Sequence, residues 1–195
     1  MFQLNKKEAR LIILQRIELI SNFLKRVRKF FGRYFFSNFI SKYFLSTKNV
    51  GKVYFEDMHQ EFESINSVIN PHNKNLLSIG GGLGGLELVI NKKFSVKSFT
   101  FIERNYISKK VKYGWDNKNN EAYNDTSIQK NFLIKNGMES SRFTIFDYDN
   151  DQLPKDKFDI IISLFSLDYH YDFKIYLDYL KSITHTHSKI IFDTI

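Results

Sequence analysis

A glycine-rich segment directly after a short apolar strand constrains the fold of this chain more than any other feature. Residues 75–79 read Asn-Leu-Leu-Ser-Ile, and five of the next six residues are glycine. Glycine allows a sharp turn and lets the backbone approach a ligand at positions where a Cβ would clash. A strand that runs into a glycine loop and then into a helix start predicts a nucleotide-type cofactor site.

A carboxylate stands where such a site would need one. The apolar segment 99–103 ends at Glu103, 23 residues after Gly80. An acidic residue about 20 residues beyond a dinucleotide-binding loop accepts hydrogen bonds from ribose hydroxyls. We therefore expect Glu103 to bind the ribose of a nucleotide cofactor.

Two motifs overlap in the glycine loop. Gly80, Gly82 and Gly85 satisfy the G-x-G-x-x-G dinucleotide pattern. Ser78, Gly80, Gly82 and Gly84 resemble the acidic-x-G-x-G-x-G loop of the class I S-adenosylmethionine-dependent methyltransferases, with Ser78 in place of the usual acid.

Two segments downstream favour the methyltransferase motif. Residues 141–148 resemble the third strand of that family, and residues 157–166 resemble its fourth strand, with the frequent Phe-Asp opening. The resemblance covers about residues 75–195. It implies an α/β fold with a Rossmann-like parallel sheet flanked by helices, and S-adenosylmethionine as the cofactor.

The resemblance also implies a set of cofactor ligands. Asp147 and Tyr148 would frame the adenine, and Ser163 would lie near the transferred methyl group. The implied cofactor-binding residues are Ser78, Gly80, Gly82, Gly84, Glu103, Asp147, Tyr148 and Ser163.

Apolar segments predict about five strands, at residues 76–79, 99–103, 143–146, 158–163 and 189–193. Strands that alternate with helices form a parallel sheet. Methyltransferases of this class continue through a further helix and a reversed strand pair, so we expect a sheet that lacks this C-terminal pair, in a naturally minimal or a truncated chain. Its fifth strand would be an open edge, available for self-association.

Candidate catalytic residues follow the fourth strand, because ligands of open α/β sheets bind outside the carboxyl ends of the strands. His170 could take a proton from a hydroxyl acceptor, and Asp168 or Asp172 could orient it. Alternatively, one of these aspartates caps the next helix while His170 packs beside it. We expect no metal site, because His185 and His187 have no evident third ligand.

Charge divides the chain. Residues 1–50 hold eleven Lys or Arg and two Glu, a net charge of +9 against +8 for the whole chain, so the remaining residues sum to about −1. We expect a basic helical extension or cap over residues 1–50 and a methyltransferase-like domain over residues 51–195. The body offers no overall attraction for nucleic acid, and the absence of cysteine favours a reducing cytosol.

Apolar residues at three- and four-residue steps predict one long amphipathic helix from Leu11 to Phe31, with Lys and Arg on its other face. It could cover the cofactor cleft, or residues 1–45 could contact a membrane peripherally; nucleic-acid binding is a third alternative. No apolar run approaches the roughly 20 residues that span a bilayer. A second helix is predicted over residues 55–69, before Asn70-Pro71.

The most economical function is a cytoplasmic S-adenosylmethionine-dependent methyltransferase, with or without peripheral membrane contact. Its acceptor would be a small molecule, a sugar or a glycolipid-type, lipid-linked molecule, methylated at oxygen because His170 and nearby carboxylates offer a base. One alternative is a truncated or non-catalytic cofactor-binding module. Another is an NAD(P)-dependent oxidoreductase, although no Tyr-x-x-x-Lys pair is evident.

Overall fold

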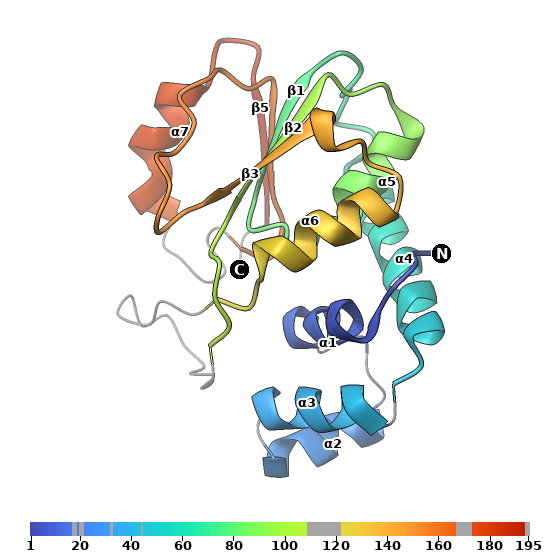
Figure 1. Ribbon diagram of the computed structural model, residues 1–195. Coiled ribbons are helices and arrows are strands. Elements are labelled where there is room, and N and C mark those ends of the chain that lie inside the picture. The colour runs from blue at the N-terminus through green and yellow to red at the C-terminus, as the bar shows by residue number, and fades with distance from the viewer. Residues whose placement is uncertain are drawn as a thin grey trace.

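The computed structural model describes residues 1–16, 19, 22–31, 33–43, 45–108, 122–166 and 173–193. Its centre is a five-stranded sheet in which every strand pair is parallel (Figure 1). The strands are β1 (Asn75–Ile79), β2 (Ser98–Glu103), β3 (Phe143–Asp147), β4 (Ile160–Ser163) and β5 (Lys189–Phe192). The expected fold class and the five strands are confirmed.

The strand order is β3-β2-β1-β4-β5, which places the first strand in the middle. Leu76 of β1 lies opposite Phe99 of β2 on one side and Ile160 of β4 on the other. The chain builds outward from β1 in one direction and then returns to build in the other. This is the doubly wound arrangement, in which ligands bind where the strand order reverses.

The central strands β1 and β4 are buried on both faces, as expected for parallel strands that are covered on both sides, whereas the edge strands β3 and β5 are partly exposed. Side chains alternate between the faces: Leu76 and Ile162 join one apolar cluster, whereas Leu77 and Ile161 join another. The first cluster also holds apolar residues of the N-terminal helices, and the second holds residues of the last helix.

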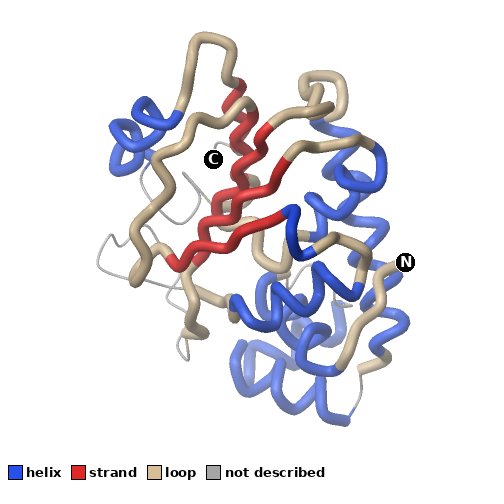
Figure 2. Tube along the Cα trace, turned by 45° about the horizontal axis from the view of Figure 1, so that its top comes forward, coloured by secondary structure: helices blue, strands red, loops and turns tan. Residues whose placement is uncertain are grey.

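Helices cover the two faces unequally. Figures 1 and 2 show most of the helices on one side of the sheet and the last helix on the other. These helices are α4 (Thr47–Ile65), α5 (Gly85–Lys93) and α6 (Thr126–Lys135) on the first side and α7 (Leu177–Ile183) on the second, with short 3₁₀ turns at Ser140–Arg142 and Phe173–Tyr176. Residues 148–159 join β3 to β4 without a helix.

The prediction of one continuous helix from Leu11 to Phe31 is wrong. The segment divides into α1 (Lys6–Gln15) and α2 (Asn22–Phe31), and α3 (Arg33–Tyr43) follows. Arg16 ends α1 with φ −126° and ψ 75°, outside the helical region. Its guanidinium pairs with Asp57 at 3.0 Å and with Glu61, so ion pairs to α4 favour the non-helical conformation at this point.

Residues 1–16 belong to the main core. Phe2, Leu11, Ile12 and Leu14 are buried in the same apolar cluster as the sheet. Asn5 caps α1 in a reciprocal capping box with Glu8, whose carboxylate oxygens lie 2.6 and 2.7 Å from Nζ of Lys135 on α6. Apolar burial and the ion pair of the buried Glu8 carboxylate with Lys135 therefore attach the N-terminus to the body.

The second predicted helix exists, but its boundaries differ from the expected residues 55–69. Helix α4 begins at Thr47, after the N-cap Ser46, and ends at Ile65. Ser46 accepts a hydrogen bond from the backbone N–H of Asn49, at 3.3 Å. The expected division of the chain at residue 50 thus falls within this helix.

Strands β3 and β5 form the two edges of the sheet, and β5 pairs with β4 alone among the described residues. Within the same described ranges, every helix is too short or too polar to cross a bilayer.

Candidate cofactor site

The glycine loop lies at the point where the strand order reverses. It leaves the carboxyl end of β1 between β2 and β4, and the backbone N–H of Gly80 donates to the carbonyl of Ile102 at 2.9 Å. Gly80, Gly82 and Gly84 have φ values of 67°, 66° and 81°, in the left-handed region that favours glycine. The sequence motif therefore corresponds to a real turn at the expected edge.

Glu103 stands beside this loop at the end of β2. Its side chain is buried and lies beside the Asn124 side chain and the backbone of Gly82 and Gly81. Burial raises its pKa well above the usual range, and the neighbouring charge of Glu87 raises it further. One oxygen, Oε1, has no hydrogen-bond partner although it is buried.

A second buried carboxyl group lies below the loop. Glu87, in the first turn of α5, is 1% exposed and lies close to the Ser78 hydroxyl. A Cβ added to Gly81 would lie 2.4 Å from Ser78 Oγ and 3.0 Å from Glu87 Oε1, so both groups reach the underside of the loop. Burial raises the pKa of Glu87 to about 7, and its Oε2 has no partner.

Glu87 was missed by sequence reasoning. Its signal was a charged residue inside the otherwise apolar segment 86–90, directly after the glycine loop. A fully buried Glu is rare unless it is paired, so such a position is informative. Ser78 stands where the acidic-x-G-x-G-x-G motif has its acid. The structure brings the carboxyl group of Glu87, from α5, close to that position.

The site has a polar rim formed by residues that sequence reasoning also missed. Asn124 Nδ2 donates to the Gly82 carbonyl at 3.1 Å, and Gln15 Nε2 donates to the Tyr123 carbonyl at 2.8 Å. A Cβ on Gly82 would lie 2.7 Å from Gln15 Oε1, so the end of α1 lies over the loop. No short motif marks Gln15 or Asn124, because both reach the loop only through tertiary packing.

Arg16 extends this rim toward β4. Its guanidinium lies over the rings of Phe165, at 5.5 Å, and Tyr54, at 6.0 Å. Phe165 follows the end of β4, with φ 58°, and its N–H donates to Asp193 beyond β5 at 3.3 Å. The start of the chain therefore meets the ends of β4 and β5 at the edge that holds the glycine loop.

Asp147 and Tyr148 lie at the end of β3, beside Glu103 in register. The Asp147 carboxylate accepts from the Asp149 N–H at 3.1 Å and from Asn150 Nδ2 at 2.7 Å, so it stabilises its own turn. The guanidinium of Arg104 lies 5.0 Å from the centre of the Tyr148 ring. These contacts place both residues at the expected edge.

Ser163 ends β4 and is buried. Its hydroxyl donates to the Ile79 carbonyl at 2.9 Å, which joins the ends of β1 and β4 where the glycine loop begins. The two predicted catalytic residues, His170 and Asp168, lie outside the described residues, as does Asp172.

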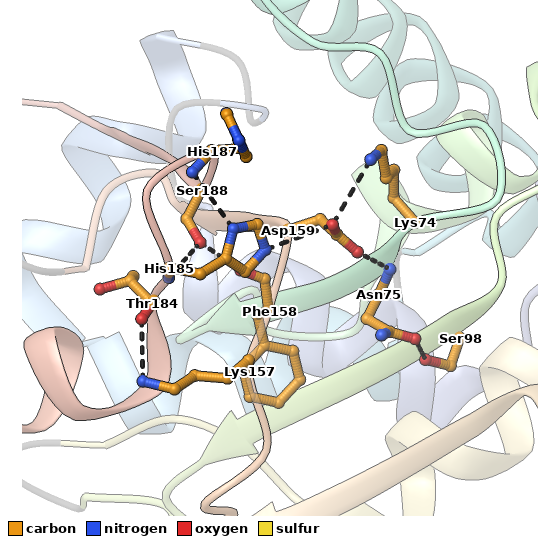
Figure 3. A network of polar contacts seen from close by, with 10 residues as sticks. All are labelled: Lys74, Asn75, Ser98, Lys157, Phe158, Asp159, Thr184, His185, His187 and Ser188. Atoms are coloured by element: carbon orange, nitrogen blue, oxygen red, sulfur yellow. Dashed lines mark hydrogen bonds and ion pairs between the residues drawn. The ribbon is translucent and has the colours of Figure 1, made fainter.

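A separate polar network lies at the amino ends of the strands, opposite the end that holds the glycine loop (Figure 3). Asp159 accepts from the Asn75 N–H at 2.9 Å and lies 3.5 Å from Lys74 Nζ and 3.4 Å from His185 Nε2. Ser188 accepts from the His185 N–H at 2.8 Å. The network joins the beginnings of β1, β4 and β5. The glycine loop lies at the other end of these strands.

Comparison with known proteins supports the fold. A candidate S-adenosylmethionine-dependent methyltransferase from Methanococcus maripaludis aligns with a TM-score of 0.51 and 15% identity, over 74% of this chain and 59% of that one. A methyltransferase from Geobacter sulfurreducens, solved with S-adenosyl-L-homocysteine, aligns at 0.46 and 13% over 70% and 47%. Coclaurine N-methyltransferase, bound to N-methylheliamine and S-adenosyl-L-homocysteine, aligns at 0.46 and 11% over 73% and 35%.

The chain therefore has the fold of the class I S-adenosylmethionine-dependent methyltransferases, as its glycine loop implied. It spans 35–59% of the length of these three solved proteins. No protein-family model matches the sequence, and no curated protein matches it either.

Proposed function

We propose that this chain binds S-adenosylmethionine at the carboxyl edge of β1 and β2 and transfers its methyl group to an acceptor. One observation carries the proposal. Glu87 and Glu103 are buried carboxyl groups, each with one unpartnered oxygen, on either side of a left-handed glycine loop at the switch point of the sheet.

The two carboxyl groups suit different parts of this cofactor. Glu103 Oε1 would accept hydrogen bonds from the ribose hydroxyls, as the acid after the second strand does in dinucleotide sites. Glu87 would receive the ammonium group of the methionine portion, in place of the acid that Ser78 replaces. Because an unpaired buried carboxylate is costly, a cationic ligand would compensate its burial.

When bound, the cofactor supplies an electrophilic methyl group for an in-line displacement. The protein contributes alignment and, where the acceptor needs it, a base. Ser163, which joins the ends of β1 and β4, would position the loop near the methyl group. We propose His170 as the base for a hydroxyl acceptor, with Asp168 to orient it; Asp147 and Tyr148 would flank the adenine.

The acceptor in this proposal is a small molecule, a sugar or a lipid-linked molecule, methylated at oxygen. The first helix would cover the cofactor, because Gln15 lies against Gly82 and Arg16 lies against Phe165. A helical segment in this place would restrict the access of water and help to define the acceptor site.

Thermal unfolding with and without ligand tests the cofactor assignment. A ligand at a hundred times its Kd stabilises the native state by about 2.7 kcal/mol, which raises Tm by about 5 °C or more. We expect S-adenosyl-L-homocysteine to produce this shift in the wild type and in the control Glu139→Ala, an exposed acid, but not in Glu103→Ala. A shift with NADH alone would instead support an oxidoreductase, and binding without turnover on any acceptor would support a non-catalytic module.

A further inference from the structure

The segment that holds α2 and α3 has an unusual composition. Residues 22–43 include six Lys or Arg, no Asp or Glu, and eight Phe or Tyr. It is therefore a cationic and aromatic unit attached to a body whose remaining charge is close to neutral. Figure 1 shows α2 and α3 at one end of the molecule, with α1 between them and α6.

One side of this unit is anchored to the body. Phe36 is buried with Ile13 of α1, and Leu24 and Val27 of α2 pack against the same small cluster. Ser37 is also buried. These contacts define the inward face of each helix.

Aromatic side chains are exposed outside that anchored face. Their exposed fractions are 73% for Phe23, 89% for Phe30, 72% for Phe35, 58% for Phe39 and 60% for Tyr43. Phe35, Phe39 and Tyr43 are four residues apart, so they form one stripe along α3, and the Phe39 and Tyr43 ring centres are 5.3 Å apart.

Basic side chains accompany the aromatic ones. Arg26 and Lys29 are exposed on α2, between Phe23 and Phe30 in the sequence. Full burial of a Phe side chain stabilises by about 1.5–3 kcal/mol, and each Lys or Arg near an anionic bilayer surface contributes about 1 kcal/mol. Exposed Phe together with Lys and Arg is the pattern of helices that lie in a lipid interface.

We propose that residues 22–43 form a surface that binds an anionic phospholipid bilayer peripherally. The charge decides between partners: a cationic unit without any acidic residue complements a negative membrane surface, and five exposed aromatic rings can enter its interfacial region. The contact does not depend on the cofactor. Through α1, which packs against α3 and carries Gln15 over the glycine loop, it would bring the cofactor edge close to the membrane.

Vesicle flotation with the full chain tests this surface. We expect the wild type to float with vesicles that contain phosphatidylserine and to remain unbound with pure phosphatidylcholine. Raising the ionic strength from about 0.1 M to about 1 M, which shortens the Debye length from about 10 Å to about 3 Å, should release it. Deleting residues 1–45 is an unsuitable test, because residues 1–16 belong to the core.

Point variants assign the contact to the helices. Phe23→Ser/Phe30→Ser/Phe35→Ser should weaken vesicle binding at least about tenfold. Val68→Ser/Ile175→Ser, which removes exposed apolar side chains elsewhere, should bind like the wild type. Both variants should retain the wild-type Tm within a few degrees, because the replaced side chains are exposed.

Three results would overturn the proposal. The first is failure of the folded wild type to bind phosphatidylserine vesicles, and the second is unchanged binding by the triple variant. The third is that no protein binds vesicles but the triple variant loses a property of the wild type. Loss of a dimer would assign the surface to a second copy of the chain, and loss of RNA binding would assign it to nucleic acid.

Discussion

Ser78 and Glu87 both lie beneath Gly81, where an added Cβ would stand 2.4 Å from Ser78 Oγ and 3.0 Å from Glu87 Oε1, so a strand residue and a helix residue together bring one carboxyl group beneath the glycine loop. In the motif that this loop resembles, the strand itself provides the acid. Here the strand position is a hydroxyl and the acid comes from α5. The carboxyl group of the candidate site thus comes from the helix, and variants at residues 78 and 87 can test this arrangement.

Moving the acid from residue 87 of α5 to residue 78 of β1 should preserve ligand binding. Glu87→Ala should weaken the binding of S-adenosyl-L-homocysteine by about tenfold or more, because the ammonium group loses its carboxylate partner. Ser78→Asp/Glu87→Ala should recover most of the affinity, since the acid then stands on the strand. Calorimetric Kd values for the wild type and both variants measure this; equal affinities in all three proteins would show that neither position contacts the ligand.

Glu87 should make stability depend on pH. Its pKa is raised by burial to about 7, whereas a Glu in the unfolded chain titrates near 4.3. Between these values the native state holds a proton that the unfolded state has lost, so the free energy of unfolding falls as pH rises. The contribution is about 4 kcal/mol, fully present below the unfolded pKa and lost above pH 7.

Glu87→Gln separates this effect from other titrations. The neutral isostere should equal the wild type in free energy of unfolding at about pH 3.5, below the unfolded pKa, and exceed it at pH 8. Urea unfolding at several pH values gives the comparison, with Glu139→Gln as the exposed control. Parallel pH profiles for the wild type and Glu87→Gln would contradict the buried titration.

The Glu8–Lys135 pair should be important for stability. Glu8 is fully buried, caps the start of α1 and is bound by Lys135 Nζ at 2.6 and 2.7 Å. Removing the lysine leaves the fully buried Glu8 carboxylate uncompensated, which costs about 3 kcal/mol. Lys135→Met should therefore lower the free energy of urea unfolding by about this amount, whereas Lys130→Met, at an exposed position of the same helix, should change it little. Similar values for the two variants would refute the structural role of the pair.

The contribution of Asp159 to stability should change with pH in the opposite direction from that of Glu87. Its burial works against ionisation, but the Asn75 N–H and the charge of Lys74 lower the pKa of its carboxyl overall. Its contribution to stability is therefore present above the unfolded pKa and lost as pH falls through the folded pKa. Asp159→Asn should be less stable than the wild type at pH 7 and should lose the difference as pH falls through the lowered pKa of the folded state, as followed by thermal unfolding.

The sheet was predictable because its signals are local. Each strand is an apolar run of four to six residues, and the loop after β1 has glycine where the backbone adopts positive φ. Glu103 was also predictable, because its position follows from the end of β2.

The N-terminal helices were less predictable, because their boundaries depend on long-range contacts. The apolar steps from Leu11 to Phe31 fit one helix, but Arg16 pairs with Asp57 and Glu61, 41 and 45 residues away. Gln15 and Asn124 meet across 109 residues for the same reason. Spacing along the chain does not encode such pairs, and the role of Glu87 likewise depends on the burial that packing produces.

The most direct test of the central claim is an isothermal titration of the full chain with S-adenosyl-L-homocysteine, run beside NADH and repeated with Glu103→Ala. We predict micromolar binding of S-adenosyl-L-homocysteine alone, lost in the variant although the variant remains folded. Absence of binding by the folded wild type, or binding that Glu103→Ala leaves unchanged, would contradict the proposed cofactor site.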